Sequence, residues 1–275
     1  MKTNIKRIAL LIIALLTFYS YVDAQKNIYI EVFAQPGFSC GGDYSYLKTF
    51  STSGYEFSNL DKSKTFGINT GVLFGYNLNK HLSISSGLTY AHQGQNYKPF
   101  IETLNASAGM QRTLNRSVSL NYFKIPVKLS YIIHPDNKIA FIISGGLYFS
   151  LLYNYTDKSE FSDGVSYVAI GASETIIDNN GTTVYDFTNK LPYKFYDFGG
   201  LLSAGIQYKL NDKFSIPISI YYEYGFIDIK NTDAQSNNGY GEKRVIWING
   251  SPNMTLPYHN SSFGISIGLK LQLKN

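Results

Sequence analysis

Strict alternation of apolar and other residues marks two segments near the C-terminus. In the last one, serine, glycine, lysine and glutamine separate a regular apolar series, Phe263, Ile265, Ile267, Leu269, Leu271 and Leu273. The segment before it, from Phe214 to Phe226, has the same period of two. This period is typical of β-strands whose two faces meet different surroundings. The last segment spans 11 residues, within the ~9–11 that a tilted membrane-crossing strand needs.

Six further segments raise the number of predicted strands to eight. Three of them, 66–78, 123–133 and 140–153, show the alternation clearly, and the other three, 28–38, 82–90 and 196–210, show it more weakly. Tight turns at 79–80, 134–137 and 211–213 alternate with long polar segments near 39–64, 95–116, 157–191 and 228–260. Short turns on one side and long loops on the other are typical of outer-membrane barrels. The sequence therefore predicts an all-β fold, an eight-stranded antiparallel transmembrane β-barrel in the cell outer membrane, with short periplasmic turns and long extracellular loops.

A water-soluble barrel is the alternative, since such barrels also show alternation at period two. Its outer wall would carry many charges, whereas the face opposite the apolar one is mainly Ser, Gly, Asn and Thr here. Tyrosines also cluster near both ends of the predicted strands: Tyr76, Tyr131 and Tyr208 on the turn side, and Tyr90, Tyr153, Tyr222 and Tyr224 on the loop side. Two such groups match the interfacial girdles of membrane barrels.

The N-terminus is typical of a secretory signal peptide. A basic start with Lys2, Lys6 and Arg7 precedes an apolar run at 8–18 and a small-residue site ending at Ala24. We therefore expect residues 1–24 to be a signal peptide and residues 25–275 to form the barrel domain. Removal of three cations and Asp23 lowers the formal net charge from +5 to +3, too little to indicate a nucleic-acid partner.

Six charged residues fall on the strand face opposite the apolar one, so we expect them to point into the barrel: Glu31, Lys124, Lys128, Asp197, Glu223 and Lys270. Counted from the periplasmic turns, Lys124 and Glu223 stand at similar heights on strands counted as four apart in the ring. Lys128 and Glu31 are also close in height. Because isolated charges in a narrow interior are costly, we predict a Lys124–Glu223 pair with a Lys128–Glu31 pair below it. An eight-stranded interior is filled by side chains, which argues against an open pore.

The residues that could support catalysis or metal binding lack the required context. Two G-x-S-x-G matches contain Ser39, at the start of a predicted loop, and Ser266, on the last strand, and neither stands at a strand-to-helix elbow. Asp178 to Gly181 resembles the start of a calcium loop without its closing glutamate, and a β-turn is favoured. Cys40 is the only cysteine, which excludes an intrachain disulfide and a cysteine-based metal centre. No catalytic residue, metal site or cofactor is therefore assigned.

Several segments match the pattern of one known family. They are 64–76, 82–90, 144–148, 197–205 and 222–226, and the most specific is Tyr122-Phe-Lys-Ile-Pro-Val-Lys-Leu-Ser-Tyr131. Together these segments resemble the PorT-type outer-membrane β-barrel family of the Bacteroidota. The resemblance covers most of residues 60–275. It implies an eight-stranded outer-membrane barrel, and a member of known role belongs to a protein-secretion and gliding apparatus. It brings no catalytic residues to this chain.

These observations predict a non-enzymatic envelope protein whose long loops contact a partner. The expected partners are outer-membrane lipid and an envelope or secretion-machinery protein. The alternative is an outer-membrane lipid-modifying hydrolase, in which His92 or His259 near the extracellular side would meet a serine and a carboxylate. A narrow channel is a third option, which side chains of Lys124, Tyr221 and Glu223 would block.

Overall fold

The computed structural model describes residues 28–41, 46–51, 54–59, 62–63, 65–105, 110–170, 173–178, 181–186, 193–229, 236–237, 243–244 and 259–273. The expected signal peptide, residues 1–24, lies outside these ranges. No helix in the described part of the chain is long and apolar enough to span a bilayer.

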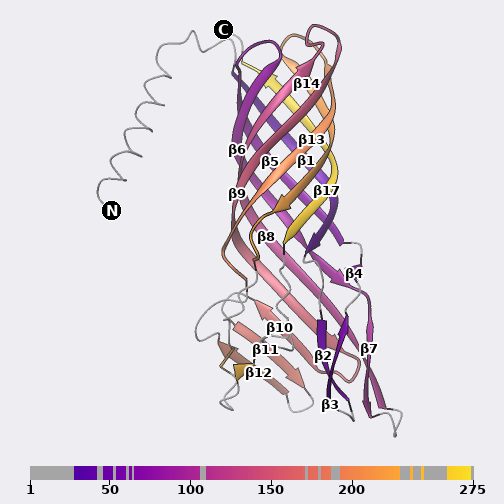
Figure 1. The fold of residues 1–275 in the computed structure, drawn as a ribbon. Coiled ribbons are helices and arrows are strands. Elements are labelled where there is room, and N and C mark those ends of the chain that lie inside the picture. Colours follow the sequence, from indigo (N-terminus) through magenta and orange to yellow (C-terminus); the bar gives the residue numbers. More distant parts are fainter. Residues whose placement is uncertain are drawn as a thin grey trace, which may run out of the picture.

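Eight long strands close into a barrel (Figure 1), namely β1 (Ile28–Gly41), β5 (Thr65–Asn77), β6 (Leu82–Tyr97), β8 (Met110–Ile133), β9 (Ile139–Phe161), β13 (Tyr196–Lys209), β14 (Phe214–Gly225) and β17 (Asn260–Gln272). Each strand is antiparallel to its neighbours in that order. β17 pairs with β1 and closes the ring. The predicted fold class and all eight predicted strands are confirmed.

The segments predicted as long polar loops contain much additional β-structure, which corrects the prediction. β6, β8 and β9 run past their predicted ends, and shorter strands lie at the end of the barrel away from Ile28 and Leu273 (Figure 1): β2 (Tyr46–Ser51), β3 (Gly54–Asn59), β4 (Lys62–Ser63), β7 (Phe100–Asn105), β10 (Ser166–Ile170), β11 (Ser173–Asp178), β12 (Gly181–Asp186), β15 (Ser236–Asn237) and β16 (Lys243–Arg244). β4 pairs with β6 and β7 with β8, whereas β2 with β3 and β15 with β16 form separate two-stranded sheets. β10, β11 and β12 continue the sheet outward from β9. The sheet therefore extends from one side of the barrel beyond the membrane. We call this part, formed by residues 110–122 of β8, residues 154–161 of β9, and β10, β11 and β12, the extracellular sheet.

The three tight turns lie where they were predicted, at the periplasmic end. In two of them an asparagine side chain holds the turn. Oδ1 of Asn79 accepts hydrogen bonds from the backbone N–H groups of His81 and Leu82, each at 2.8 Å. Oδ1 of Asn211 does the same for Lys213 and Phe214, at 2.8 and 2.9 Å. Such local bonds explain why asparagine is favoured in tight turns.

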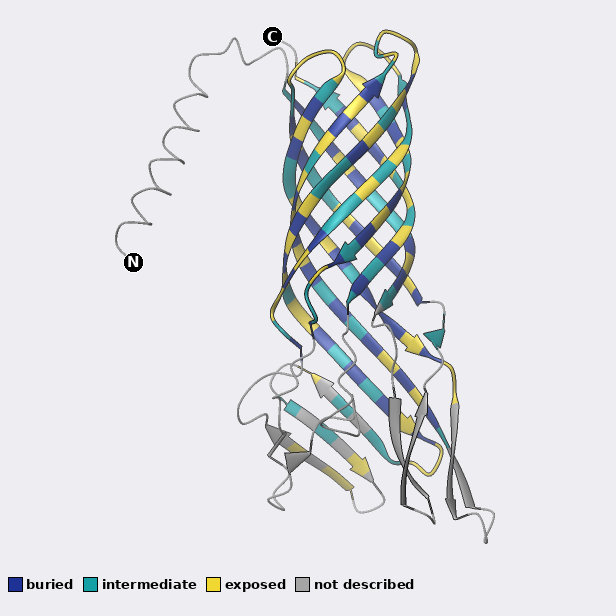
Figure 2. Ribbon diagram, in the orientation of Figure 1, coloured by how far each residue is buried: buried dark blue, intermediate teal, exposed yellow. Residues whose placement is uncertain are grey.

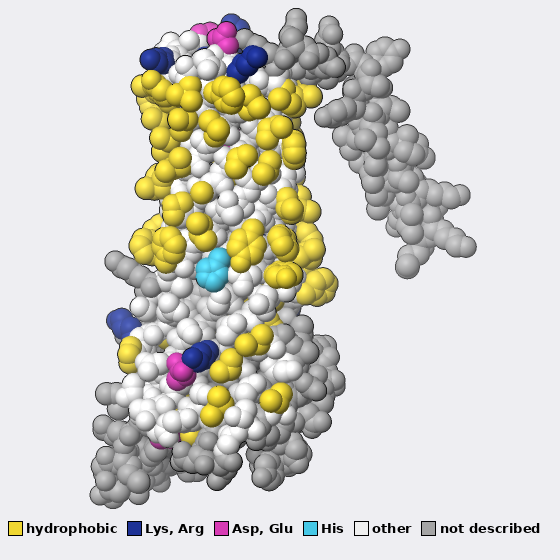
Figure 3. Space-filling view, turned by 180° about the vertical axis from the view of Figure 1, so that it is seen from behind, with side chains coloured by type: hydrophobic (Ala, Val, Ile, Leu, Met, Phe, Trp, Pro, Cys, Tyr) yellow, Lys and Arg dark blue, Asp and Glu magenta, His cyan; other side chains and the backbone are white. Residues whose placement is uncertain are grey.

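The barrel wall alternates between buried and exposed residues along each strand (Figure 2). The exposed positions are mainly apolar on all eight strands, including Phe74, Leu88, Phe141, Leu202, Ile220 and Ile265, and we call this apolar zone of the wall the belt. On the face that Figure 3 shows, apolar side chains gather over the barrel. The buried positions on the same strands point into the barrel and are largely polar, including Ser85, Thr89, Ser130, Ser144 and Ser150. This arrangement suits a wall with lipid outside and a packed polar lumen inside.

Beyond the belt the two faces exchange character. Most of the buried residues there are apolar or aromatic and form a compact cluster: Ala91, Tyr97, Leu114, Val118, Leu120, Tyr122, Tyr155, Phe161, Tyr193 and Ile229. A smaller number of buried polar residues lie in the same region: Gln93, Gln95, Arg116, Asp157 and Ser159. On β8, residues of one parity point inward along the whole strand, from Leu114 through Lys124 to Ser130. On the neighbouring β9, Asn154 pairs with Asn121 and Leu152 pairs with Tyr122, which leaves Tyr153 as an extra residue, a β-bulge. The residues of β9 that point inward therefore have even numbers before the bulge and odd numbers after it.

Glycines make room for large lumen side chains at two places. A Cβ on Gly75 would lie 2.0 Å from the ring of Tyr29 on the adjacent β1. A Cβ on Gly199 would lie 2.4 Å from the hydroxyl oxygen of Tyr148 on β9. Any larger residue at these positions would displace a buried aromatic ring.

Replacing Ile220 by lysine tests the membrane belt. Ile220 is 68% exposed and lies at the middle of β14. Ile220→Lys should lower the free energy of unfolding by about 2–4 kcal/mol, because a charge at mid-bilayer loses its hydration. Urea titration in lipid vesicles, followed by mobility in unheated gels, measures the change. Val184→Lys is the control, since Val184 is 60% exposed on the extracellular sheet, and a change there above about 0.5 kcal/mol would contradict the assignment.

Candidate functional site

The six charged residues expected in the lumen all lie on the inner wall of the barrel. Five are buried, and Lys128 is partly buried. Three are cations and three are anions, so their formal charges cancel. Four of them form two ion pairs and the other two do not, as described next.

The first pair is the centre of a polar cluster that crosses the lumen. Nζ of Lys124 on β8 lies 2.7 Å from Oε2 of Glu223 on β14. The same oxygen accepts hydrogen bonds from Nδ2 of Asn69 at 3.3 Å and from Oγ of Ser262 at 3.2 Å. Lys124 also lies over the ring of Tyr148, 4.6 Å from its centre. β8 and β14 are three places apart in the ring, not the four counted from the sequence, which still sets the two charges across the lumen from each other.

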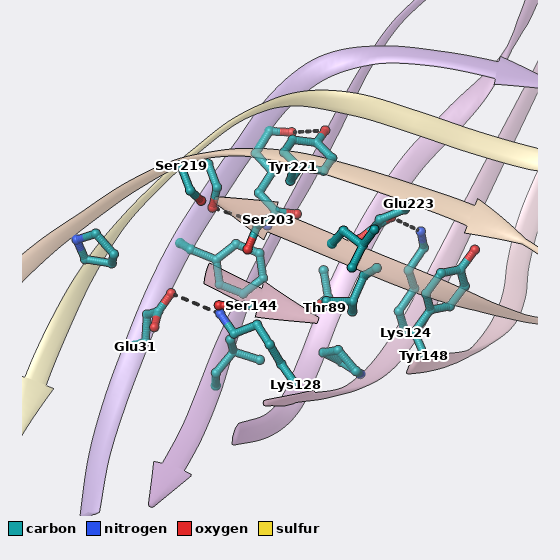
Figure 4. A pocket seen from close by; sticks show the side chains of 18 of the residues that line it. Glu31, Thr89, Lys124, Lys128, Ser144, Tyr148, Ser203, Ser219, Tyr221 and Glu223 are labelled. Carbon is teal, nitrogen blue, oxygen red and sulfur yellow. Dashed lines mark hydrogen bonds and ion pairs between the residues drawn. The ribbon is translucent and has the colours of Figure 1, made fainter. Parts of the chain in front are cut away.

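The second pair lies nearer the periplasmic end. Nζ of Lys128 lies 3.8 Å from Oε1 of Glu31 on β1. Between the two pairs is a cavity of about 50 Å³ (Figure 4), whose wall includes Ser144, Ser203 and Ser219. A space of this size holds a few water molecules, since each needs at least about 10–15 Å³. It is far below the roughly 300 Å³ of small-molecule pockets.

Asp197 and Lys270 do not form ion pairs with other described residues. Oδ2 of Asp197 accepts a hydrogen bond from Nδ2 of Asn260 at 3.1 Å. The same amide group donates to the hydroxyl oxygen of Tyr122 at 3.0 Å. Nζ of Lys270 lies 3.6 Å from the ring centre of Tyr29. A carboxylate is thus held by an amide, and an ammonium by an aromatic face.

Sequence reasoning missed the neutral partners in this network. Asn69, Asn260 and Tyr148 fall on the inward face of their strands. This position in the alternation is the one feature of the sequence that could have indicated them. The lumen is also crossed by Tyr221, whose hydroxyl donates to the backbone oxygen of Gln35 at 3.1 Å. Together with the Lys124–Glu223 pair, this side chain fills the interior where a channel would have to pass.

A third buried ion pair lies on the extracellular sheet, in a segment predicted to be loop. Arg116 on β8 donates from Nη2 and Nε to the carboxylate of Asp157 on β9, at 2.9 and 3.2 Å. The hydroxyl of Tyr193 donates to the same carboxylate at 2.8 Å. Burial alone would lower the pKa of Arg116, but the nearby Asp157 carboxylate outweighs it and raises the pKa. The guanidinium therefore stays cationic at any pH the barrel meets.

The histidines considered for a hydrolase have other neighbours. Nδ1 of His92 lies 2.7 Å from Oδ1 of Asn121. Nδ1 of His259 lies 3.0 Å from the backbone oxygen of Gly225, and its ring stacks on Tyr224. Within the described ranges, no ring nitrogen of His92 or of His259 has a hydrogen bond to a serine or a carboxylate.

The remaining sequence candidates lie on strands. Ser39 and Cys40 lie within β1, and not in a loop as predicted. Oγ of Ser39 donates to the backbone oxygen of Gly94 at 3.0 Å and accepts from its N–H at 3.1 Å. Ser266 lies on β17. Asp178 pairs with Gly181 in the hairpin between β11 and β12, the turn that was favoured over a calcium loop. The described residues hold no cluster of three or more His, Cys, Asp or Glu suited to a metal ion.

Breaking the central pair should destabilise the barrel. Glu223→Ala leaves the Lys124 ammonium in the lumen without its carboxylate, and a loss of about 3–5 kcal/mol is expected. Combining Lys124→Met with Glu223→Leu should restore most of the lost free energy of unfolding, because no unpaired charge remains from this pair. Urea titration in vesicles provides the values.

Lys80→Ala is the matched control for this experiment, because the Lys80–Asp136 pair is 76% and 79% exposed. It should change stability by less than about 1 kcal/mol. Equal effects of Glu223→Ala and Lys80→Ala would show that the lumen pair does not stabilise the barrel.

The chain is similar to solved barrel structures at low sequence identity. Neisserial surface protein A is 8% identical with a TM-score of 0.40, over 89% of this chain and 96% of that chain. OprG from Pseudomonas aeruginosa is 13% identical with a TM-score of 0.37, over 90% and 96%. The outer membrane protease OmpT from Escherichia coli is 9% identical with a TM-score of 0.35, over 92% and 99%.

No curated protein matches the chain. A family model described as an outer membrane protein beta-barrel domain matches residues 24–231. The match ends before β17, the strand that closes the ring on β1. With most of its length matched and a closed barrel in its structure, the chain belongs to the outer membrane protein beta-barrel domain family and is located in the outer membrane.

Proposed function

We propose that the protein is a non-enzymatic component of the outer membrane that binds a protein partner through its extracellular sheet. The observation that carries the proposal is an apolar patch on the outer face of this sheet. It consists of Ile170, Ile177 and Val184, which are 50%, 41% and 60% exposed. Exposed apolar side chains are expected in the lipid belt, but these three lie on one face of strands beyond it, and apolar surface outside the belt favours a binding site.

The strand register places the three residues on one face. Ile177 on β11 is paired with Ser166 on β10, and Val184 on β12 is paired with Thr175 on β11. Directly paired residues point to the same side of a sheet, and so do residues two apart on one strand. Ile170 therefore shares its side with Ile177 and Val184, and we call these three residues the extracellular apolar patch.

A binding role is also favoured by the construction of this region. The cluster around Leu120 and Tyr155 and the buried Arg116–Asp157 pair lie on or against β8 and β9. β10 is hydrogen-bonded to β9 along Ser166–Ile170, and β11 and β12 continue that pairing outward. The patch is therefore attached through backbone pairing to strands that have their own core, which lowers the entropy lost on binding. The histidine contacts described above favour this role over that of a lipid-modifying hydrolase.

The partner we propose is another envelope protein. The resemblance of residues 122–131 to PorT-type barrels of the Bacteroidota supports a link to protein secretion. The proposal includes export through a signal peptide at residues 1–24 and a mature barrel domain at 25–275.

Charge substitutions in the patch test the proposal. Ile177→Lys and Val184→Lys should each lower recovery of a stoichiometric companion protein at least about tenfold, because binding would desolvate an ammonium against an apolar surface. Purification from the native outer membrane in mild detergent, with quantitative mass spectrometry, measures the recovery. Ser117→Lys is the control, since Ser117 is an exposed polar residue on the outward side of β8. The same companion recovered equally with all variants would refute the proposed surface.

A further inference from the structure

We propose a second binding surface, independent of the apolar patch, for the sugar headgroup of a glycolipid in the outer leaflet. It lies on the outer wall where β6, β8 and β9 leave the lipid belt. Its residues are Tyr90, His92, Asn121, Phe123, Tyr153 and Asn154, which we call the headgroup patch.

The position of the patch follows from the strand pattern. Leu88, Ile125 and Phe149 are exposed lipid-facing residues on these three strands. Farther along, the first polar residues on the same outer face are His92 on β6, Asn121 on β8 and Asn154 on β9. His92 is paired with Asn121, and Asn121 with Asn154, so they form one row. Acyl chains lying on the belt would therefore place their headgroup on this row.

Hydrogen bonds within the patch fix what it can offer to a ligand. Oδ1 of Asn121 accepts a hydrogen bond from the hydroxyl of Tyr90 at 2.8 Å and lies 2.7 Å from Nδ1 of His92. Because an amide oxygen can only accept, the ring proton of a neutral His92 is on Nδ1, and Nε2 is an acceptor. Among the described residues, Nε2 of His92 and Nδ2 of Asn121 have no hydrogen-bond partner.

This leaves one acceptor and one donor in the same row, which fits hydroxyl groups. A sugar hydroxyl donates one hydrogen bond and accepts others, so the hydroxyls of a sugar can satisfy both atoms. An ionised phosphate oxygen only accepts and would leave Nε2 unsatisfied. The nearest charges on the outer face of β9 belong to Lys158 and Glu160, which pair with each other at 2.7 Å. The patch therefore favours hydroxyl chemistry over attraction to negative charge.

Aromatic rings flank the hydrogen-bonding atoms on the membrane side. The ring centres of Tyr90 and Phe123 are 6.0 Å apart, and those of Phe123 and Tyr153 are 5.4 Å apart, both edge to face. Tyr153 is 71% exposed. Aromatic faces carry partial negative charge and attract the C–H edges of a sugar ring, and they are enriched at headgroup level. A row of rings below polar atoms thus matches a sugar joined to acyl chains.

Lipid retention provides the test. The full chain is reconstituted in phosphatidylcholine vesicles that contain either lipid A, a phosphorylated glucosamine disaccharide lipid, or phosphatidylglycerol at equal negative charge. It is then extracted in mild detergent, and the retained lipid is quantified by mass spectrometry. The wild type should retain lipid A in excess of phosphatidylglycerol. Asn121→Ala and His92→Phe should each lower lipid A retention about fivefold, the loss expected for one hydrogen bond.

Two further variants keep the result interpretable. His259→Phe replaces the other histidine at the outer end of the barrel, stacked on Tyr224, and should leave lipid A retention unchanged. The mobility of unheated samples shows whether each variant has folded. Should Asn121→Ala fail to fold, Tyr153→Ala still tests the patch, because it removes an exposed ring and should lower lipid A retention. Equal retention of lipid A and phosphatidylglycerol, or no change in the folded patch variants, would overturn the proposal.

Discussion

Every backbone N–H and C=O group inside the hydrocarbon layer has to be paired within the chain, because no water is there to bind it. The pairing of β17 with β1 meets this requirement, since it joins the two ends of the sheet from Tyr29–Gln272 to Gly41–Asn260. Closure in turn creates a lumen that polar side chains must fill. The lumen charges are tolerable because the ring places anions and cations opposite each other and neutral amides around them.

The wall of the barrel meets two different surroundings. In the belt, lipid lies outside and the inner face is mainly polar. Beyond the belt, water lies outside and the inner face is mainly apolar. β8 achieves the change by sequence alone, since its apolar residues move from one parity to the other between Tyr122 and Phe123. On β9 the apolar residues keep one parity along the strand. The extra residue at Tyr153 forms a bulge, so this parity faces lipid before the bulge and the interior after it. The extracellular sheet is therefore a continuation of the barrel with its faces reversed.

This reversal explains which parts of the fold the sequence could predict. The belt strands were predictable because Phe263 to Leu273 and their counterparts repeat one pattern against one solvent. Residues 110–122 were missed because Leu114, Val118 and Leu120 are out of phase with Ile125 and the strand that follows. The two lumen pairs were predictable from strand heights in a closed ring. The contacts of Asn69 and Asn260 depend on how far short side chains reach across the lumen, which spacing along one strand does not encode.

The two proposed surfaces follow from the same arrangement. In the described part of the lumen, Tyr221 and the Lys124–Glu223 pair fill the interior and leave a cavity of only about 50 Å³, which favours binding on the outer wall. That wall has one zone where lipid headgroups contact His92 and Asn121, and another, farther out, where Ile177 and Val184 face water. Because the bulge at Tyr153 lies between these zones, it determines both which face of β9 meets the headgroups and which face of β10 to β12 is presented to a partner. Restoring a regular β9 would turn the apolar patch inward, so binding by the extracellular sheet depends on a residue at the membrane surface.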